Sequence, residues 1–227
     1  MNNHLSMMSE KLAMRKEYFK KGFQEWKSEF FEYKYLILLS LIIVAIATFL
    51  DYFSGVYVSS TTAADVPDLI LDHIGPFDMS FLFVYGYLAL VFTLFLYPLF
   101  LHIRTLHMVV SQLSLLVMLR ALFMIFTHLQ TPLSAIDVHF PWIFGRLSFQ
   151  NDMFFSGHTA IPFLGFFLFK RSWIRYLFLI GSIFLAITAL LMHRHYSIDV
   201  FAAFFITYCS YRLGQIFLGK IEPYIKK

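Results

Sequence analysis

The sequence is poor in charged residues and in cysteine. Asp, Glu, Lys and Arg make up 14% of its 227 residues, whereas soluble globular domains carry about 25%. The single cysteine, Cys209, has no second cysteine to pair with, which excludes a scaffold of intrachain disulfides. Hydrophobic residues make up 59% of the chain, including 29 Phe and 13 Tyr, and a disordered protein lacks such apolar surface. The composition excludes an ordinary water-soluble enzyme and indicates an integral membrane protein.

Six apolar stretches are candidates for transmembrane helices. A helix that rises about 1.5 Å per residue needs about 20 residues to cross a hydrocarbon layer of about 30 Å. The candidates are residues 35–53, 79–101, 108–126, 153–169, 173–192 and 198–218. The fourth is the weakest, because it begins among polar residues and contains Pro162, but the spans on either side require an odd number of crossings between them. The sequence predicts an all-α bundle of six membrane-spanning helices.

Two charged segments flank the predicted catalytic membrane domain, which covers residues 35–218. Residues 1–34 mix Lys and Glu with aromatic residues. This pattern predicts a short amphipathic helix at the cytoplasmic membrane interface, and a solvated charged lead-in is the alternative. Residues 219–227 are predicted to form a basic cytoplasmic tail.

The distribution of Lys and Arg predicts the orientation of the chain. Fifteen of the 18 lie on one side of the predicted spans, whereas Arg146 and Arg194 lie on the other and Arg120 lies within a span. The first span and the connection after it carry five Asp residues and no Lys or Arg on the outward side (positions 51, 65, 68, 72 and 78). Because cytoplasmic loops are enriched in Lys and Arg, we expect a multi-pass protein with both termini cytoplasmic and its polar site at the outer face, whether extracellular, periplasmic or lumenal.

One of two polar segments at this outward face lies between the fifth and sixth spans. His195 and Asp199 are four residues apart, so on a helix they would share a face. A carboxylate that accepts a hydrogen bond from one imidazole nitrogen fixes the tautomer and leaves the other nitrogen to act as base or nucleophile. A structural His–Asp pair that anchors the end of the helix is the alternative.

The other polar segment contains Ser156, Gly157 and His158 at the start of the fourth span. The free amide groups of a helix N-terminus favour an anion such as phosphate, and a glycine permits close backbone approach. A second histidine facing His195 could protonate a leaving group and deprotonate an incoming one. Ser-Gly-His alone is a weak signal, but together with His195 and Asp199 it predicts a site for chemistry at phosphorus.

Arg120 adds a cation beneath the outer face. It lies 12 residues into the third span, and a central Arg costs about 2.5–3.5 kcal/mol on insertion scales. We therefore expect an anionic partner, which could be Asp199, Asp152 or a substrate phosphate. The sequence leaves open whether Arg120 contacts substrate or forms a structural ion pair.

Four segments, in order, resemble motifs of the sphingomyelin synthase family, within the wider type 2 phosphatidic acid phosphatase superfamily. They are residues 66–73, residues 119–120 with 131–133, residues 151–152 with 155–159, and residue 193 with 195–200. The resemblance covers nearly all of the chain after Lys34. It implies that His195 is the nucleophile, that Asp199 orients it, and that His158 donates and accepts the proton. Around them we expect substrate contacts from Arg120, Asp152, Ser156, Gly157, His193, Arg194 and Tyr196.

The resemblance implies a double displacement on membrane lipids. A phosphocholine or phosphoethanolamine group would move from a glycerophospholipid to His195, releasing diacylglycerol, and then to ceramide or another hydroxyl lipid. The reaction would need no cofactor or metal, and no nucleic acid partner is expected; the oligomeric state is left open. Three departures stand out: Arg194 where the family tends to carry an acidic residue, Thr188-Ala189 where the wider group has Ser-Arg, and Phe155 where that group has Pro. The last two favour a phosphodiester substrate over a phosphomonoester.

Three other functions remain compatible with these residues. The same two histidines and aspartate could serve a lipid phosphate phosphatase or a phospholipase C-like hydrolase, with water as acceptor. A metal site is the second alternative, because suitable metal ligands are present among His158, His193, His195 and Asp199. A non-enzymatic lipid transporter or scaffold could use the polar cluster for binding.

Overall fold

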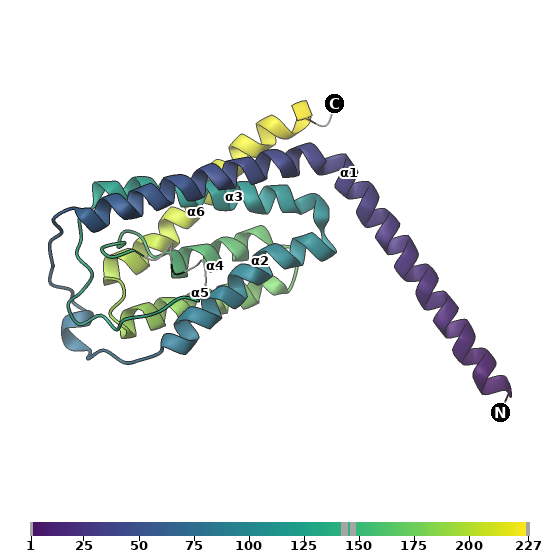
Figure 1. Ribbon diagram of the computed structural model, residues 1–227, viewed down its shortest axis with the longest axis horizontal. Coiled ribbons are helices and arrows are strands. Elements are labelled where there is room, and N and C mark those ends of the chain that lie inside the picture. Colours follow the sequence, from purple (N-terminus) through teal and green to yellow (C-terminus); the bar gives the residue numbers. More distant parts are fainter. Residues whose placement is uncertain (1, 142–144, 146–148, 226–227) are drawn as a thin grey trace.

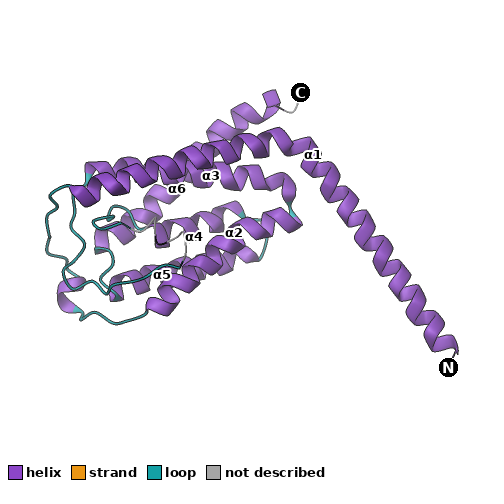
Figure 2. Cartoon of the chain, in the orientation of Figure 1, coloured by secondary structure: helices purple, strands orange, loops and turns teal. Residues whose placement is uncertain are grey.

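The computed structural model describes residues 2–141, 145 and 149–225, with side chains for residues 17, 20–141, 145 and 149–220. Within these ranges the chain is all-helical and forms no β-strand (Figures 1 and 2). The short helical segments η1 (Leu71–His73) and η2 (Leu82–Gly86) precede the second long helix, and η2 runs directly into it. The α-helices are α1 (Asn2–Ser60), α2 (Tyr87–Leu101), α3 (Ile103–Phe126), α4 (Gly157–Leu168), α5 (Ile174–Leu191) and α6 (Ser197–Ile225).

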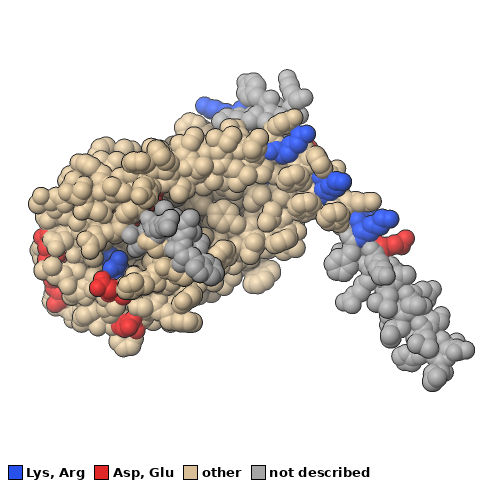
Figure 3. All heavy atoms as spheres, in the orientation of Figure 1, with Lys and Arg blue, Asp and Glu red and all other residues tan. Residues whose placement is uncertain are grey.

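Five helical segments are long and apolar enough to cross a membrane. They are Lys20–Ser60, Leu82–Leu101, Ile103–Phe126, Ile174–Leu191 and Ser197–Lys220. Their outer faces expose large apolar side chains such as Phe49, Ile180 and Phe205, which water would disfavour and lipid would solvate. Figure 3 shows a largely uncharged surface over the middle of the bundle, with most of the visible Lys and Arg toward one end and most of the visible Asp and Glu toward the other. The structure thus fits a multi-pass membrane protein.

Helix α4 is shorter than the predicted fourth span at 153–169. It has 12 residues and begins at Gly157, because Ser156 has an extended backbone conformation. At about 1.5 Å per residue it is about 18 Å long, too short to span a bilayer alone. It packs against α2, α3, α5 and α6, and Thr159 and Leu164 are completely buried. Because protein surrounds it, α4 does not have to match the thickness of the lipid.

The predicted boundary at residue 34 does not interrupt the backbone. Helix α1 is continuous from Asn2 to Ser60, and Figure 1 shows its N-terminal part projecting from the bundle while its later part follows α3. Residues 2–34 contain no proline and a single glycine, Gly22, so no strong helix breaker stands between the charged segment and the first span. Trp26 Nε1 donates to the Leu99 carbonyl at 2.8 Å, which ties this helix to the end of α2.

Helix α6 similarly continues past the predicted boundary at residue 219. Arg146, Lys226 and Lys227, three of the charges that entered the orientation prediction, lie outside the described residues. The orientation of the chain stays a prediction of the charge pattern.

Three interhelical connections meet at one end of the bundle. The α1–α2 connection pairs with the α3–α4 connection through Ala64, whose amide donates to the His128 carbonyl at 3.1 Å and whose carbonyl accepts from Gln130 at 2.9 Å. The α5–α6 connection joins them, because the Met192 carbonyl accepts from the Ile136 amide at 3.0 Å. These bonds hold the polar segments 151–159 and 193–200 at the same end of the molecule.

Candidate active site

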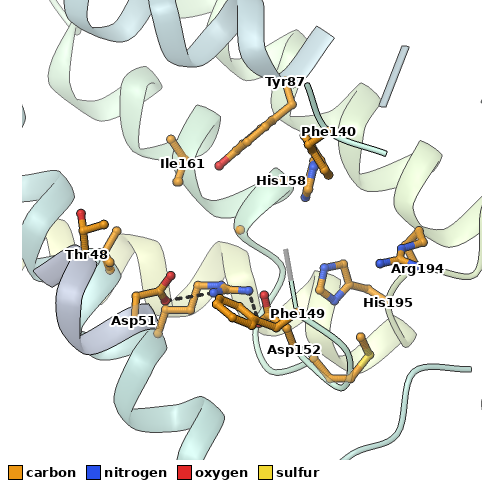
Figure 4. A pocket seen from close by; sticks show the side chains of 14 residues that line it. Thr48, Asp51, Tyr87, Phe140, Phe149, Asp152, His158, Ile161, Arg194 and His195 are labelled. Carbon is orange, nitrogen blue, oxygen red and sulfur yellow. Dashed lines mark hydrogen bonds and ion pairs between the residues drawn. The ribbon is translucent and has the colours of Figure 1, made fainter. Parts of the chain in front are cut away.

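A cavity of about 220 Å³ opens at this end of the bundle. Every helix from α1 to α4 contributes to its wall, as do the α3–α4 and α5–α6 connections (Figure 4). The lining residues are Thr48, Asp51, Tyr87, Val117, Arg120, Phe140, Phe149, Asp152, Met153, Gly157, His158, Ile161, Arg194 and His195. The cavity therefore joins residues from four predicted spans and from both polar segments.

His195 and Asp199 form a close pair on one side of the cavity. His195 Nδ1 lies 3.4 Å from Asp199 Oδ2, and the two side chains are 7% and 0% exposed. His195 precedes the start of α6, so the pair forms across the entry to the helix and not along one helical face as predicted. Asp199 Oδ2 also accepts from the Tyr196 amide at 3.1 Å. Because Nδ1 faces the carboxylate, Nε2 is the nitrogen left for a substrate.

His158, the second residue of α4, lines the same cavity from another wall. Its ring stacks on Phe83, with ring centroids 3.8 Å apart and planes 16° apart, and it packs against Tyr87 at 4.2 Å. His158 Nε2 is buried and has no hydrogen-bond partner among the described residues. Figure 4 shows His158 and His195 at the same part of the cavity. The fold thus brings together the two imidazoles that the sequence placed in separate segments.

One backbone hydrogen bond joins the segments that carry these two histidines. The Ser156 amide donates to the backbone carbonyl of Asp199 at 3.2 Å. Ser156 is completely buried, and its Oγ accepts from Thr159 Oγ1 at 3.3 Å. Ser156 therefore fixes the start of α4 against the start of α6 and does not line the cavity.

Arg120 is held by two carboxylates. Its guanidinium donates to Asp51 Oδ1 at 3.1 Å and to Asp152 Oδ1, and its Nε donates to the Phe155 carbonyl at 3.2 Å. The sequence named Asp152 as a possible partner, whereas Asp51 of α1 was not foreseen. Asp199, another predicted partner, pairs with His195 instead. A Cβ at Gly157 would lie 3.4 Å from Arg120 Nε, an ordinary contact distance, so the start of α4 packs closely against the guanidinium.

Arg194 is a second cation on the cavity wall, close to His195 in Figure 4. Within the described part of the chain it forms no ion pair with a carboxylate. Burial lowers the pKa of its guanidinium, while Asp137 and Asp152 oppose that shift. The group stays protonated at neutral pH because an arginine side chain loses its proton only at strongly alkaline pH. Arg194 is thus available to a bound anion.

His193 and Tyr196 lie away from the cavity and make bonds between the connections. His193 Nδ1 is 2.6 Å from Ser134 Oγ and its Nε2 is 2.8 Å from the Ile74 carbonyl, so both ring nitrogens have partners. The Tyr196 hydroxyl donates to Asp65 Oδ1 at 2.8 Å. Burial and this hydrogen bond raise the pKa of Tyr196 to about 12. In this geometry both residues hold the site in shape without touching its cavity.

Asp152 is positioned by its neighbour Asn151. The Asn151 side chain accepts from the Thr131 amide at 3.0 Å, and the Asn151 amide donates to Thr131 Oγ1 at 3.0 Å. Asn151 has a φ of 60°, a left-handed conformation that asparagine adopts more readily than most residues. This reciprocal pair fixes the loop from which Asp152 reaches Arg120.

The aromatic part of the cavity wall was missed by sequence reasoning. Phe140 and Phe149 come from the α3–α4 connection and Tyr87 from α2, and no local motif marks any of them. Phe149 lies directly against the backbone of α1 at Gly55, where a Cβ would overlap its ring. For Asp51 a weak signal existed, because a carboxylate at the end of an apolar span requires a partner.

This constellation suits reactions at phosphorus. It offers an imidazole nitrogen oriented by a carboxylate, a second imidazole for proton transfer and an arginine for the phosphoryl charge. Among the described residues, no three His, Cys, Asp or Glu side chains are grouped as metal ligands.

Comparison with known families points to the same class of chemistry. The sequence model of the family described as PAP2 superfamily C-terminal matches residues 151–216. The matched region contains His158, His195 and Asp199, together with α4, α5 and most of α6. A search of curated proteins finds no match to the chain. Residues 151–216 are thus similar to the PAP2 superfamily, a superfamily of phosphatases and phosphotransferases.

Proposed function

We propose that this protein is a phospholipid head-group phosphotransferase. It moves phosphocholine or phosphoethanolamine from a glycerophospholipid to ceramide or another hydroxyl lipid. The observation that carries the proposal is the convergence of His158 and His195 on one cavity, with Asp199 Oδ2 3.4 Å from His195 Nδ1. The PAP2 match supports the phosphatase or phosphotransferase class, and the resemblance to sphingomyelin synthases supports transfer to a lipid.

In the first half-reaction, His195 Nε2 attacks the phosphorus of the donor lipid. The bond between phosphorus and the diacylglycerol oxygen breaks, and His158 donates a proton to that oxygen as diacylglycerol leaves. The imidazole of His195 gains positive charge as the nitrogen–phosphorus bond forms, and the Asp199 carboxylate stabilises this charge. The product is a phosphohistidine that carries the head group.

In the second half-reaction, the hydroxyl group of the acceptor lipid replaces the departed diacylglycerol. His158, now neutral, takes the hydroxyl proton, and the acceptor oxygen attacks phosphorus. The phosphorus–nitrogen bond breaks and His195 returns to its starting state. Each half-reaction needs one proton transfer by the same imidazole in opposite directions, as microscopic reversibility requires.

The charge available at the cavity favours a phosphodiester. A phosphodiester carries one negative charge, whereas a phosphomonoester carries about −1.5 to −2 at pH 7. Arg194 is the cation on the cavity wall that has no carboxylate partner in the described part of the chain, because Arg120 is paired with Asp51 and Asp152. One such cation matches one negative charge.

The test uses the purified full-length protein in proteoliposomes. Phosphatidylcholine or phosphatidylethanolamine with a radiolabelled head group serves as donor, with and without ceramide. Transfer predicts a labelled sphingolipid that forms only with ceramide present, together with one diacylglycerol per transfer. The His195→Ala variant should form neither product, whereas His102→Ala, at an exposed position between α2 and α3, serves as a matched histidine substitution.

The distribution of label decides between the candidate activities. Label recovered as a water-soluble head group, equally with and without ceramide, would overturn the transferase and support a hydrolase of the same class. Lipid binding without turnover would overturn the enzymatic proposal and support a transporter or scaffold.

A further inference from the structure

Charge is distributed unevenly along the cavity. Figure 4 shows Arg194 beside His195 at one end, Asp51 at the other and Asp152 between them. Arg120 bridges the carboxylates of Asp51 and Asp152. Asp51, Arg120 and Asp152, here called the Asp–Arg–Asp cluster, combine two carboxylates with one guanidinium and carry a formal net charge of −1. Their side chains are only 17%, 13% and 15% exposed, so water screens this charge weakly.

Each carboxylate of the cluster uses one oxygen to bind Arg120. Asp51 and Asp152 both accept through Oδ1. No hydrogen bond to either Oδ2 atom forms among the described residues, and neither Oδ2 is sealed from solvent. The cluster therefore satisfies the guanidinium and keeps acceptor oxygens for another cation.

An aromatic wall adjoins the cluster. The Phe149 ring lies beside Asp152 in Figure 4 and lines the same cavity as Arg120. Its centroid is 5.6 Å from that of Tyr52. Gly55 lets the ring lie flush against α1, so its position is fixed from two sides. Aromatic faces attract ammonium groups, most strongly where the cation is desolvated.

A further observation shows that the cavity is built for a ligand. His158 Nε2 is buried at the cavity wall and has no hydrogen-bond partner among the described residues. The His195 side chain, which is 5% exposed, lines the same cavity. Buried polar atoms without partners are rare in folded proteins, and a bound phosphate placed between these rings would supply the missing partner.

We propose that the Asp–Arg–Asp cluster and Phe149 form the subsite for the ammonium group of a zwitterionic donor, and that this subsite selects phosphocholine or phosphoethanolamine lipids over phosphodiesters whose head group lacks a cation. This inference rests on the proposed function. With its phosphate between His195 and Arg194, such a donor aligns its own dipole with the charge gradient of the cavity. A donor without the ammonium group leaves the net negative charge of the cluster uncompensated.

The experiment compares two phosphodiester donors, phosphatidylcholine and phosphatidylglycerol, which differ in the presence of the ammonium group. The Asp51→Asn variant keeps an oxygen for Arg120 and removes one negative charge. It should lower kcat/KM for phosphatidylcholine by about tenfold or more and leave the value for phosphatidylglycerol unchanged or raised. Phe149→Leu, which leaves the ion pairs intact, should act in the same direction. Asp78→Asn, on the exposed loop before η2, controls for the general loss of one negative charge. It should leave kcat/KM unchanged for both donors.

Binding measurements keep this inference separate from the proposed function. The detergent-solubilised full-length protein is titrated with glycerophosphocholine and with glycerophosphoglycerol. Preferential binding of glycerophosphocholine that Asp51→Asn abolishes supports the subsite even if no lipid is turned over. Equal affinity for the two probes would overturn the subsite and leave the cluster a purely structural ion pair. So would an equal fall in kcat/KM for both donors in Asp51→Asn and Phe149→Leu.

Discussion

Replacement of Asp199 by Asn tests the orienting carboxylate with little change in shape. Asparagine has nearly the same volume, and its side-chain oxygen can still accept from the Tyr196 amide, as Asp199 Oδ2 does at 3.1 Å. The backbone bond from Ser156 to the Asp199 carbonyl is also unaffected by the change. The variant should therefore fold, while the charge opposite His195 is lost.

The separation of the two groups sets the expected magnitude. Two unit charges 3.4 Å apart interact by about 5 kcal/mol at an effective dielectric constant of about 20. That energy corresponds to between about 10³ and 10⁴ in rate. Because the imidazole carries only part of its final charge at the transition state, we expect kcat to fall by about 10³.

Head-group transfer in proteoliposomes measures this effect, with phosphatidylcholine at saturation. Gel filtration and thermal unfolding in detergent check that the Asp199→Asn variant is folded. A variant that unfolds like the parent and keeps kcat within about tenfold would refute the role assigned to Asp199. The pair would then serve only to anchor the start of α6.

Further variants test the roles of other residues. His158→Ala should lower the rate of transfer from phospholipids by about 10³. The variant should still release one equivalent of nitrophenolate from p-nitrophenylphosphocholine in a rapid burst, because this leaving group needs no proton. Stopped-flow absorbance measures the burst, and its loss would contradict the proton-transfer role of His158. Arg194→Gln should lower kcat/KM for choline and glycerol donors alike by about 10², so a selective effect on one donor in the proteoliposome assay would argue against a phosphate contact. Asp68→Asn should lower the unfolding temperature at pH 7. It should also make the unfolding temperature fall less as the pH is lowered. Burial alone would raise the pKa of Asp68, but hydrogen bonds from Ser197, Leu71 and Ile70 outweigh it and lower the pKa. The stabilisation is therefore present above the unfolded pKa of about 3.9 and is lost as pH falls through the lowered folded value. If the unfolding temperatures of the parent protein and of Asp68→Asn fall equally between pH 7 and pH 3, Asp68 does not provide this stabilisation.

Features that depend on nearby residues were predicted best. Long apolar runs in the sequence locate the five helical segments that could cross a membrane. A chain in lipid must pair its backbone polar groups within a helix, because leaving them unpaired there is costly. The closeness of His195 and Asp199 likewise follows from their separation by four residues, although the pair forms at the entry to α6 and not within it. The continuity of α1 beyond residue 34 was missed, since a change in composition does not end a helix that lacks a breaker.

Features that depend on tertiary packing could not be predicted. Asp51 joins Arg120 because α1 packs along α3, and Phe149 reaches the cavity because Gly55 gives it space on α1. His193 was expected to contact substrate, yet Ser134 and the Ile74 carbonyl occupy its two nitrogens. Each of these outcomes is decided by residues at least 59 positions away along the chain, or by a packing contact that no local pattern records.

The covalent intermediate offers the most direct test of the central claim. The His158→Ala variant is mixed with p-nitrophenylphosphocholine and quenched in alkali, because phosphohistidine is labile in acid, and peptides are analysed by mass spectrometry. We predict a phosphocholine adduct on His195 that His195→Ala, assayed in the same way, does not form. An adduct on a different residue, or full transfer activity in a protein that lacks His195, would contradict the account.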